Sequence, residues 1–124
     1  MSNRSHHTLA DVVEYIMANR RGKAFQHWTR SDITLALNDS LDDGAFLYSV
    51  DGKGNINGVC HGRKFVRNNV LFVFNILTTG RGVLNNFIER FKEMFPGYRL
   101  EGKRHDKIKI YNTDRFVSKL LPKG

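Results

Sequence analysis

Two glycines flank an arginine at Gly80-Arg81-Gly82, between an apolar segment and a run with a strong helical pattern. The first N–H groups of a helix have no acceptor inside the helix, and the helix dipole makes that end positive. A glycine turn lets an anion approach these groups closely, which suits a phosphate or pyrophosphate. Arg81 either adds a contact to phosphate or points into solvent. The turn is a candidate anion site, with an ordinary tight turn as the alternative.

Other spacings point away from metal and nucleotide chemistry. A run that begins like a calcium loop at Asp51 has Ile56 at the position where that loop needs glycine. Cys60 and His61 are adjacent without a second ligand pair, which disfavours a structural zinc site. Gly82 is not followed by lysine and a hydroxyl residue, so the P-loop pattern for nucleotide hydrolysis is absent. We therefore expect no metal centre.

Hydrophobic periodicity predicts the elements that position the turn, in the order α-α-β-β-β-α-β-β-α. We expect residues 1–7 to form a flexible leader and residues 8–124 to form a single α+β domain. Four helices are expected. The first follows an N-cap at Thr8, the second begins at Ser31, the third runs from the glycine turn to Phe95, and the fourth spans Thr113–Leu120. The expected strands are Ala45–Val50, Ile56–His61 or Ile56–Phe65, Val70–Leu77, Tyr98–Lys103 and Lys107–Tyr111. Short turns make most neighbours antiparallel, and the helical crossover makes one pair parallel, so we expect a mixed, mainly antiparallel sheet covered by helices.

The segment Val70–Leu77 is apolar at nearly every position. A strand that is apolar on both faces is typical of the centre of a sheet with layers on both sides. The sequence therefore predicts that this central strand is buried on both faces.

Composition and charge restrict the partners. The chain has 124 residues and a formal net charge of +8, with acidic residues concentrated between Asp39 and Asp43. Such a positive balance favours a polyanionic partner: nucleic acid, an acidic protein or a phosphate-rich cofactor. The single cysteine, Cys60, indicates a reducing, cytoplasmic setting, and no apolar run is long enough to span a membrane.

The order of elements around the turn resembles the GNAT superfamily of N-acyltransferases. That family carries the signature R/Q-x-x-G-x-G/A, and the segment from Leu77 to Gly82 matches it at Gly80 and Gly82. Leu77 replaces the leading Arg or Gln. A more distant similarity to toxin-activating lysine acyltransferases involves His27 before the second helix and the helix ending at Phe95-Pro96. The small size would suit a phage-encoded variant.

The resemblance implies a GNAT-like fold in which the turn binds the pyrophosphate of acetyl-CoA or another acyl-CoA. A splayed central strand would receive the pantetheine arm. The residues implied to bind the cofactor are Ile76, Leu77, Thr78, Thr79, Gly80, Arg81, Gly82 and Val83.

Acyl transfer to an amine requires a base for the ammonium group and an acid for the leaving thiolate. His27 is the first candidate for the base and His61 the second, because histidine titrates near neutral pH. The resemblance implies that Tyr111 could protonate the thiolate. The toxin-activating enzymes use an acidic residue on the central strand, where this chain has Asn75. Each of the three candidates could instead be a structural residue.

Two functions remain open from the sequence. The first is an acyl-CoA-dependent N-acyltransferase that acts on an amine of a protein or small molecule. The alternative is a catalytically silent GNAT-like basic binder of nucleic acid or an acidic host protein. Basic and aromatic residues favour the latter in the stretch Arg63–Arg67 and in the segment from Tyr98 to Tyr111.

Overall fold

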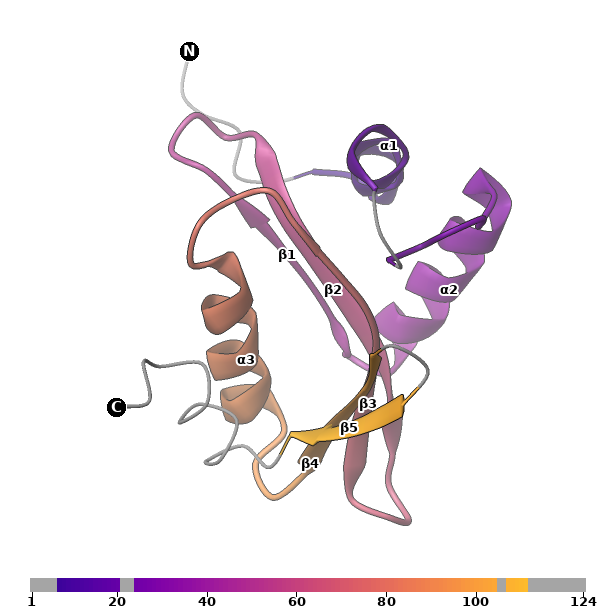
Figure 1. Cartoon of the computed structure of the whole chain (residues 1–124), viewed down its shortest axis with the longest axis vertical. Helices are drawn as coiled ribbons and strands as arrows, with labels where there is room; N and C mark the ends of the chain where they lie inside the picture. Colours follow the sequence, from indigo (N-terminus) through magenta and orange to yellow (C-terminus); the bar gives the residue numbers. More distant parts are fainter. Residues whose placement is uncertain (1–6, 21–23, 105–106, 112–124) are drawn as a thin grey trace.

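The computed structural model describes residues 7–20, 24–104 and 107–111, which form a mixed α+β architecture (Figure 1). The helices are α1 (Leu9–Asn19), α2 (Arg30–Asp42) and α3 (Val83–Met94). The strands are β1 (Phe46–Val50), β2 (Ile56–Phe65), β3 (Val70–Thr78), β4 (Arg99–Arg104) and β5 (Lys107–Tyr111). The predicted order is confirmed from the first helix to the last strand, and the predicted helix Thr113–Leu120 lies outside the described residues.

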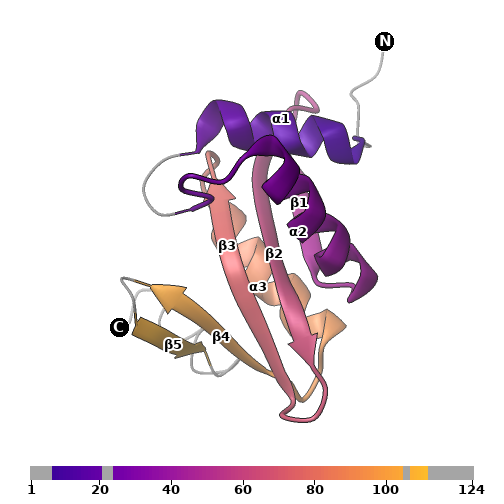
Figure 2. The ribbon, with the colours of Figure 1, turned by 90° about the vertical axis from the view of Figure 1, so that its right-hand side faces the viewer.

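The strands form one sheet in the order β1-β2-β3-β4-β5. Neighbours are antiparallel except β3 and β4, which α3 connects as a parallel pair. The helices α1 and α2 lie on one face of the sheet, and α3 lies on the other (Figures 1 and 2). The predicted mixed, mainly antiparallel sheet with helices on its faces is thus confirmed.

Capping boxes fix the starts of α1 and α2. The Thr8 side chain accepts from the Asp11 N–H, and the Asp11 carboxylate accepts from the Thr8 N–H. Thr29 and Asp32 form the same reciprocal pair. Because Thr29 is the N-cap residue and its side chain accepts from the Asp32 N–H, α2 begins at Arg30, one residue earlier than the sequence predicts.

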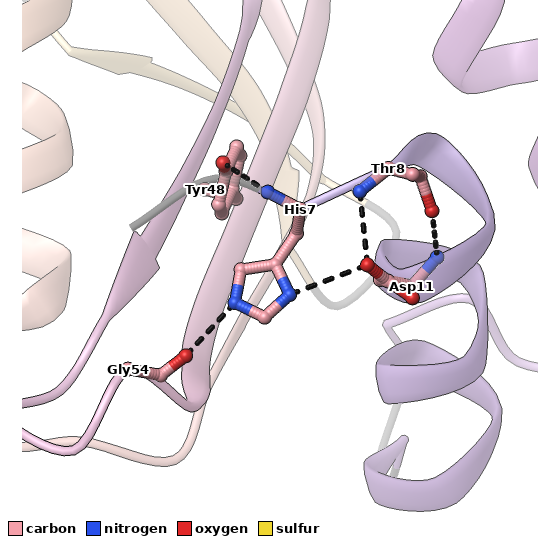
Figure 3. A network of polar contacts seen from close by, with 5 residues as sticks. All are labelled: His7, Thr8, Asp11, Tyr48 and Gly54. Atoms are coloured by element: carbon pink, nitrogen blue, oxygen red, sulfur yellow. Dashed lines mark hydrogen bonds and ion pairs between the residues drawn. The ribbon is translucent and has the colours of Figure 1, made fainter. Parts of the chain in front are cut away.

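His7, just before α1, is tied to β1 and to the turn between β1 and β2 (Figure 3). The His7 N–H donates to the Tyr48 hydroxyl at 3.0 Å, and His7 Nε2 contacts the Gly54 carbonyl at 2.8 Å. His7 Nδ1 lies 3.4 Å from the Asp11 carboxylate. His7, expected in the leader, therefore connects the start of α1 to the sheet.

The hydrophobic core has two parts, one on each face of the sheet. Under α3, the buried side chains include Leu71, Val73 and Phe91. Under α1 and α2, they include Ile16 and Leu37. The sheet separates these parts and carries side chains into both.

The prediction that β3 is buried on both faces holds only in part. Leu71, Val73 and Leu77 are buried, whereas the Phe74 residue is 42% exposed. In Figure 2, α1 and α2 lie in front of β1 and β2, and β4 and β5 lie to one side of them. A strip of β3 on the α2 face is therefore left partly open.

Candidate functional site

The parallel strands β3 and β4 separate at a bulge in β3. They pair from Val70 with Arg99 to Val73 with Gly102, and then diverge (Figure 2). On the other side of β3, Gly62 pairs with Val73 and His61 pairs with Asn75, so that Phe74 is an extra residue. A bulge bends a strand and increases its local twist. The edge of β3 from Phe74 to Thr78 therefore faces away from β2 without pairing to the described part of β4.

Gly62 makes this bulge possible. A Cβ at Gly62 would lie 2.2 Å from the Phe72 carbonyl oxygen, so only glycine fits between the strands at this point. The Gly62 N–H also donates to the Ala45 carbonyl at 2.9 Å. The close approach of β2 to β3 thus fixes the site where the sheet opens.

The glycine turn lies at the end of β3, beside the open edge. Gly82 occupies the N-cap of α3 with φ 78°, and no side chain caps the helix there. The Asn86 N–H bonds to the Gly82 carbonyl at 3.2 Å and begins the intrahelical ladder. Arg81 and Gly82 are exposed. The N–H groups of the first turn are therefore placed as an anion site requires.

The residues predicted to bind the cofactor lie in different surroundings. The side chains of Val83 and Leu77 are buried in the two parts of the core, under α3 and under α1 and α2 respectively. The Thr79 hydroxyl bonds to the Tyr15 hydroxyl at 3.0 Å, and its N–H donates to the Asn57 carbonyl. Ile76 and Thr78 are partly buried on the open segment of β3. Contacts from residues 76–83 to a bound cofactor would therefore come mainly from backbone groups and from the Arg81 side chain.

Gly80 is packed closely against β2. A Cβ at this position would lie 2.7 Å from Asn57 Nδ2 and 3.0 Å from Val83 Cγ2. Asn57 Oδ1 is buried and has no partner among the described residues. The sequence motif identified this glycine but not Asn57, which lies more than twenty residues earlier in the chain.

The loop between α1 and α2 is strained and firmly held. Phe25 and His27 both have positive φ, at 56° and 66°. This conformation is uncommon for residues with a side chain, and it persists where surrounding contacts determine it. The Arg20 guanidinium donates to the carbonyls of Phe25 and Trp28, and the Phe25 N–H donates to Asn75 Oδ1 at 3.0 Å. The Arg20 bonds fasten the loop to the end of α1, and the Asn75 bond fastens it to the open segment of β3.

His61 lies beneath this loop in a buried hydrogen-bond chain. Asn75 Oδ1 accepts from the Phe25 N–H, so its amide nitrogen faces His61 Nε2 at 2.9 Å and donates to it. The ring proton is therefore on Nδ1, which lies 3.0 Å from Ser40 Oγ. The ring is stacked on Phe25 with centroids 5.3 Å apart. Burial lowers the pKa of His61 to about 4, so the ring is neutral near pH 7.

These contacts separate the three candidates for proton transfer. His61 has no exposed surface and both of its nitrogens are engaged, so it cannot receive a proton from a substrate in this conformation. His27 is exposed on the fastened loop. Among the histidines predicted as bases, the geometry therefore favours His27.

The register of β5 places Tyr111 away from the glycine turn. Tyr111 pairs with Leu100, which pairs with Leu71 near the start of β3. From Leu71 to Thr78 the strand extends by about 23 Å, at roughly 3.3 Å per residue. Its predicted role as the proton donor therefore finds no support in the backbone arrangement.

A groove on the α2 face lies next to the fastened loop. It has a volume of about 440 Å³ and is lined by Trp28, Ala36, Asp39, Arg63, Phe72, Phe74 and Asn75. Sequence reasoning missed the aromatic walls, because Phe72 and Phe74 looked like core residues of a central strand. The sequence pattern did not reveal the bulge at Phe74. The bulge breaks the alternation of the strand, so that the adjacent residues Phe74 and Asn75 both line the groove.

The described residues show no cluster of three potential ligands for a metal ion. Within them, no helix is both long and apolar enough to cross a membrane. Cys60 is buried, and burial raises the pKa of its thiol well above the usual range.

Comparisons with known proteins do not assign the chain to a family. No protein-family model matches it, and no curated protein and no solved structure matches it significantly.

Proposed function

We propose that this chain is an acyl-CoA-dependent N-acyltransferase of GNAT type, with acetyl-CoA as the expected donor and a primary amine as the acceptor. The observation that carries the proposal is the separation of β3 from β4 beside the open N-terminus of α3. Parallel neighbours in a sheet normally hydrogen bond along their shared length. An edge left open inside a sheet can pair instead with an extended, amide-bearing ligand.

The residues present fit such a donor in two places. The uncapped N–H groups at the start of α3 suit a diphosphate, and Gly82 leaves open space beside them. The backbone of Phe74–Thr78 suits the amide-bearing arm of coenzyme A. When bound, acyl-CoA supplies the acyl group as an activated thioester.

His27 is proposed as the base that removes a proton from the incoming ammonium group. It is exposed, and its loop is held to the end of α1 by Arg20 and to β3 by Asn75. A base held in one position loses less entropy when it meets its substrate. The leaving thiolate also needs a proton, and since Tyr111 lies far from the glycine turn, we assign that proton to solvent rather than to a side chain.

The test is release of free coenzyme A from acetyl-CoA in the presence of a panel of amines, with mass spectrometry of the acetylated product. Cys60 does not disturb a thiol reagent, because it is buried in the folded chain. His27→Asn preserves a residue type that tolerates positive φ while it removes the base. We expect kcat to fall by about 100-fold or more.

Gln26→Ala is the matched control, because Gln26 is an exposed neighbour on the same loop. It should keep the activity of the unmodified chain. Full activity of His27→Asn would remove His27 from the mechanism. Absence of turnover with every amine, despite binding of acetyl-CoA, would favour a catalytically silent protein.

The second candidate function is binding to nucleic acid through the tip of the β2–β3 hairpin. Phe65 and Val66 are exposed there, and the flanking Lys64 and Arg67 are exposed as well. Exposed aromatic and basic side chains together suit stacking on single strands. Tyr98, which the sequence associated with this role, packs instead against the core under α3.

A further inference from the structure

We propose that the groove beside α2 binds an ammonium group carried on an aromatic or branched apolar body. Trp28, Phe72 and Phe74 form its walls, and Asp39 supplies a carboxylate. The identification of this ligand as the acyl acceptor rests on the proposed function. Binding of the cation itself depends on the groove alone.

The aromatic walls suit an apolar body and a cation. Phe72 and Phe74 have ring centroids 5.3 Å apart, and Phe74 and Trp28 both contact the ring of His61. Aromatic faces attract cations through their quadrupole, and tryptophan does so most strongly. A volume of about 440 Å³ is within the usual range for small-molecule sites. The groove is therefore large enough for an aromatic amine.

The charges at the rim favour a cation over an anion. Arg63 Nε donates to the Asp43 carboxylate at 2.8 Å, so that its positive charge is paired with a carboxylate. The Lys64 N–H, followed by Arg63, holds the pKa of Asp43 below its usual value. Asp39 lies 4.0 Å from Arg63 Nη1, and its side chain is 63% exposed. Asp39 is thus the less engaged carboxylate, in a chain that is otherwise strongly basic.

The groove also lies next to the residues proposed for acyl transfer. Trp28 follows His27 directly in the sequence, and its carbonyl is fastened by Arg20. Phe74 and Asn75 belong to the segment of β3 that has separated from β4. An amine in the groove would therefore lie between the loop of the proposed base and the open strand edge.

Trp28 is the only tryptophan of the chain, so its fluorescence reports on the groove. The full chain is titrated with 2-phenylethylamine, and in parallel with the neutral 2-phenylethanol and the anionic phenylacetate. We expect the amine to bind at least tenfold more tightly than either analogue. Equal binding of amine and alcohol, or tighter binding of the acid, would overturn the proposal.

Asp39→Asn should remove the preference for the amine over the alcohol. Glu89→Gln is the matched control, because it makes the same charge change at an exposed position on α3, on the other face of the sheet. Phe74→Leu should weaken the binding of both the amine and the alcohol. A preference that survives Asp39→Asn would show that the cation is recognised elsewhere.

Failure of this inference can be distinguished from failure of the proposed function. The titration is performed without coenzyme A, and coenzyme A binding is measured without amine. If the amine binds as expected but coenzyme A does not bind, the proposed amine site is supported and the proposed acyltransferase function is contradicted. If coenzyme A binds but the amine binds no more tightly than the alcohol or the acid, only the proposed amine site in the groove is contradicted.

Discussion

At the scale of single residues, the side chains of Ser40, His61 and Asn75 and the N–H of Phe25 form one chain of hydrogen bonds. Its hydrogen bonds define the tautomer of His61, because the amide of Asn75 must accept from Phe25 and donate to the ring. A neutral ring is built into the fold in this way. Protonation at Nε2 would place a donor against the donor of Asn75.

This arrangement predicts a loss of stability in mild acid. The folded pKa of His61 is about 4, below the ordinary value of 6.5, so the unfolded chain binds a proton first as the pH falls. Its contribution is complete above pH 6.5 and decreases until the pH reaches about 4. Between pH 7 and pH 5 we expect a loss of about 2 kcal/mol in the free energy of unfolding. Urea unfolding at both pH values measures it.

His61→Gln provides the comparison, since glutamine is polar but does not titrate. The variant should be less stable at pH 7 and should lose about 2 kcal/mol less than the unmodified chain between pH 7 and pH 5. Carboxylates titrate mainly below this window and are common to both chains. Identical pH dependence of the two proteins would show that His61 is not the responsible group.

At the scale of elements, local signals predicted more than contacts between strands did. The Thr8 N-cap and the apolar face of α3 are visible in the sequence because their partners lie within a few residues. The bulge at Phe74 depends on the fit of Gly62 against β3, which joins distant parts of the chain. For the same reason, the sequence could suggest the glycine turn and His27 as candidates but gave no sign of the aromatic groove.

The bulge leads to a prediction for Gly62→Ala. The added Cβ would meet the Phe72 carbonyl at 2.2 Å, and backbone would have to move to relieve the clash. We expect a loss of about 3 kcal/mol in the free energy of unfolding, together with weaker binding in the groove. Gly52→Ala is the control, because a Cβ there meets nothing within 4 Å and φ is not in the positive region. Equal stability of the two variants in urea would show that Gly62 does not hold the strands in this register.

At the scale of the whole molecule, charge and architecture act together. A net charge of +8 attracts phosphate-bearing ligands, and the fold places an uncapped helix N-terminus beside an open strand. The acidic residues from Asp39 to Asp43 lie at α2 and its end, near the groove proposed for an amine. The site proposed for an anionic donor and the groove proposed for a cationic acceptor are thus separate regions of the molecule.

The proposed coenzyme A site is tested most directly by the free energy of unfolding, measured with and without coenzyme A. At 100 times its dissociation constant, the ligand should add about 2.7 kcal/mol. Gly82→Asp should abolish this gain, because its carboxylate competes for the N–H groups of α3, whereas the uncharged Gly82→Asn should retain more of it. No gain at millimolar coenzyme A, combined with salt-sensitive retention on RNA, would contradict the acyltransferase and favour the nucleic-acid binder.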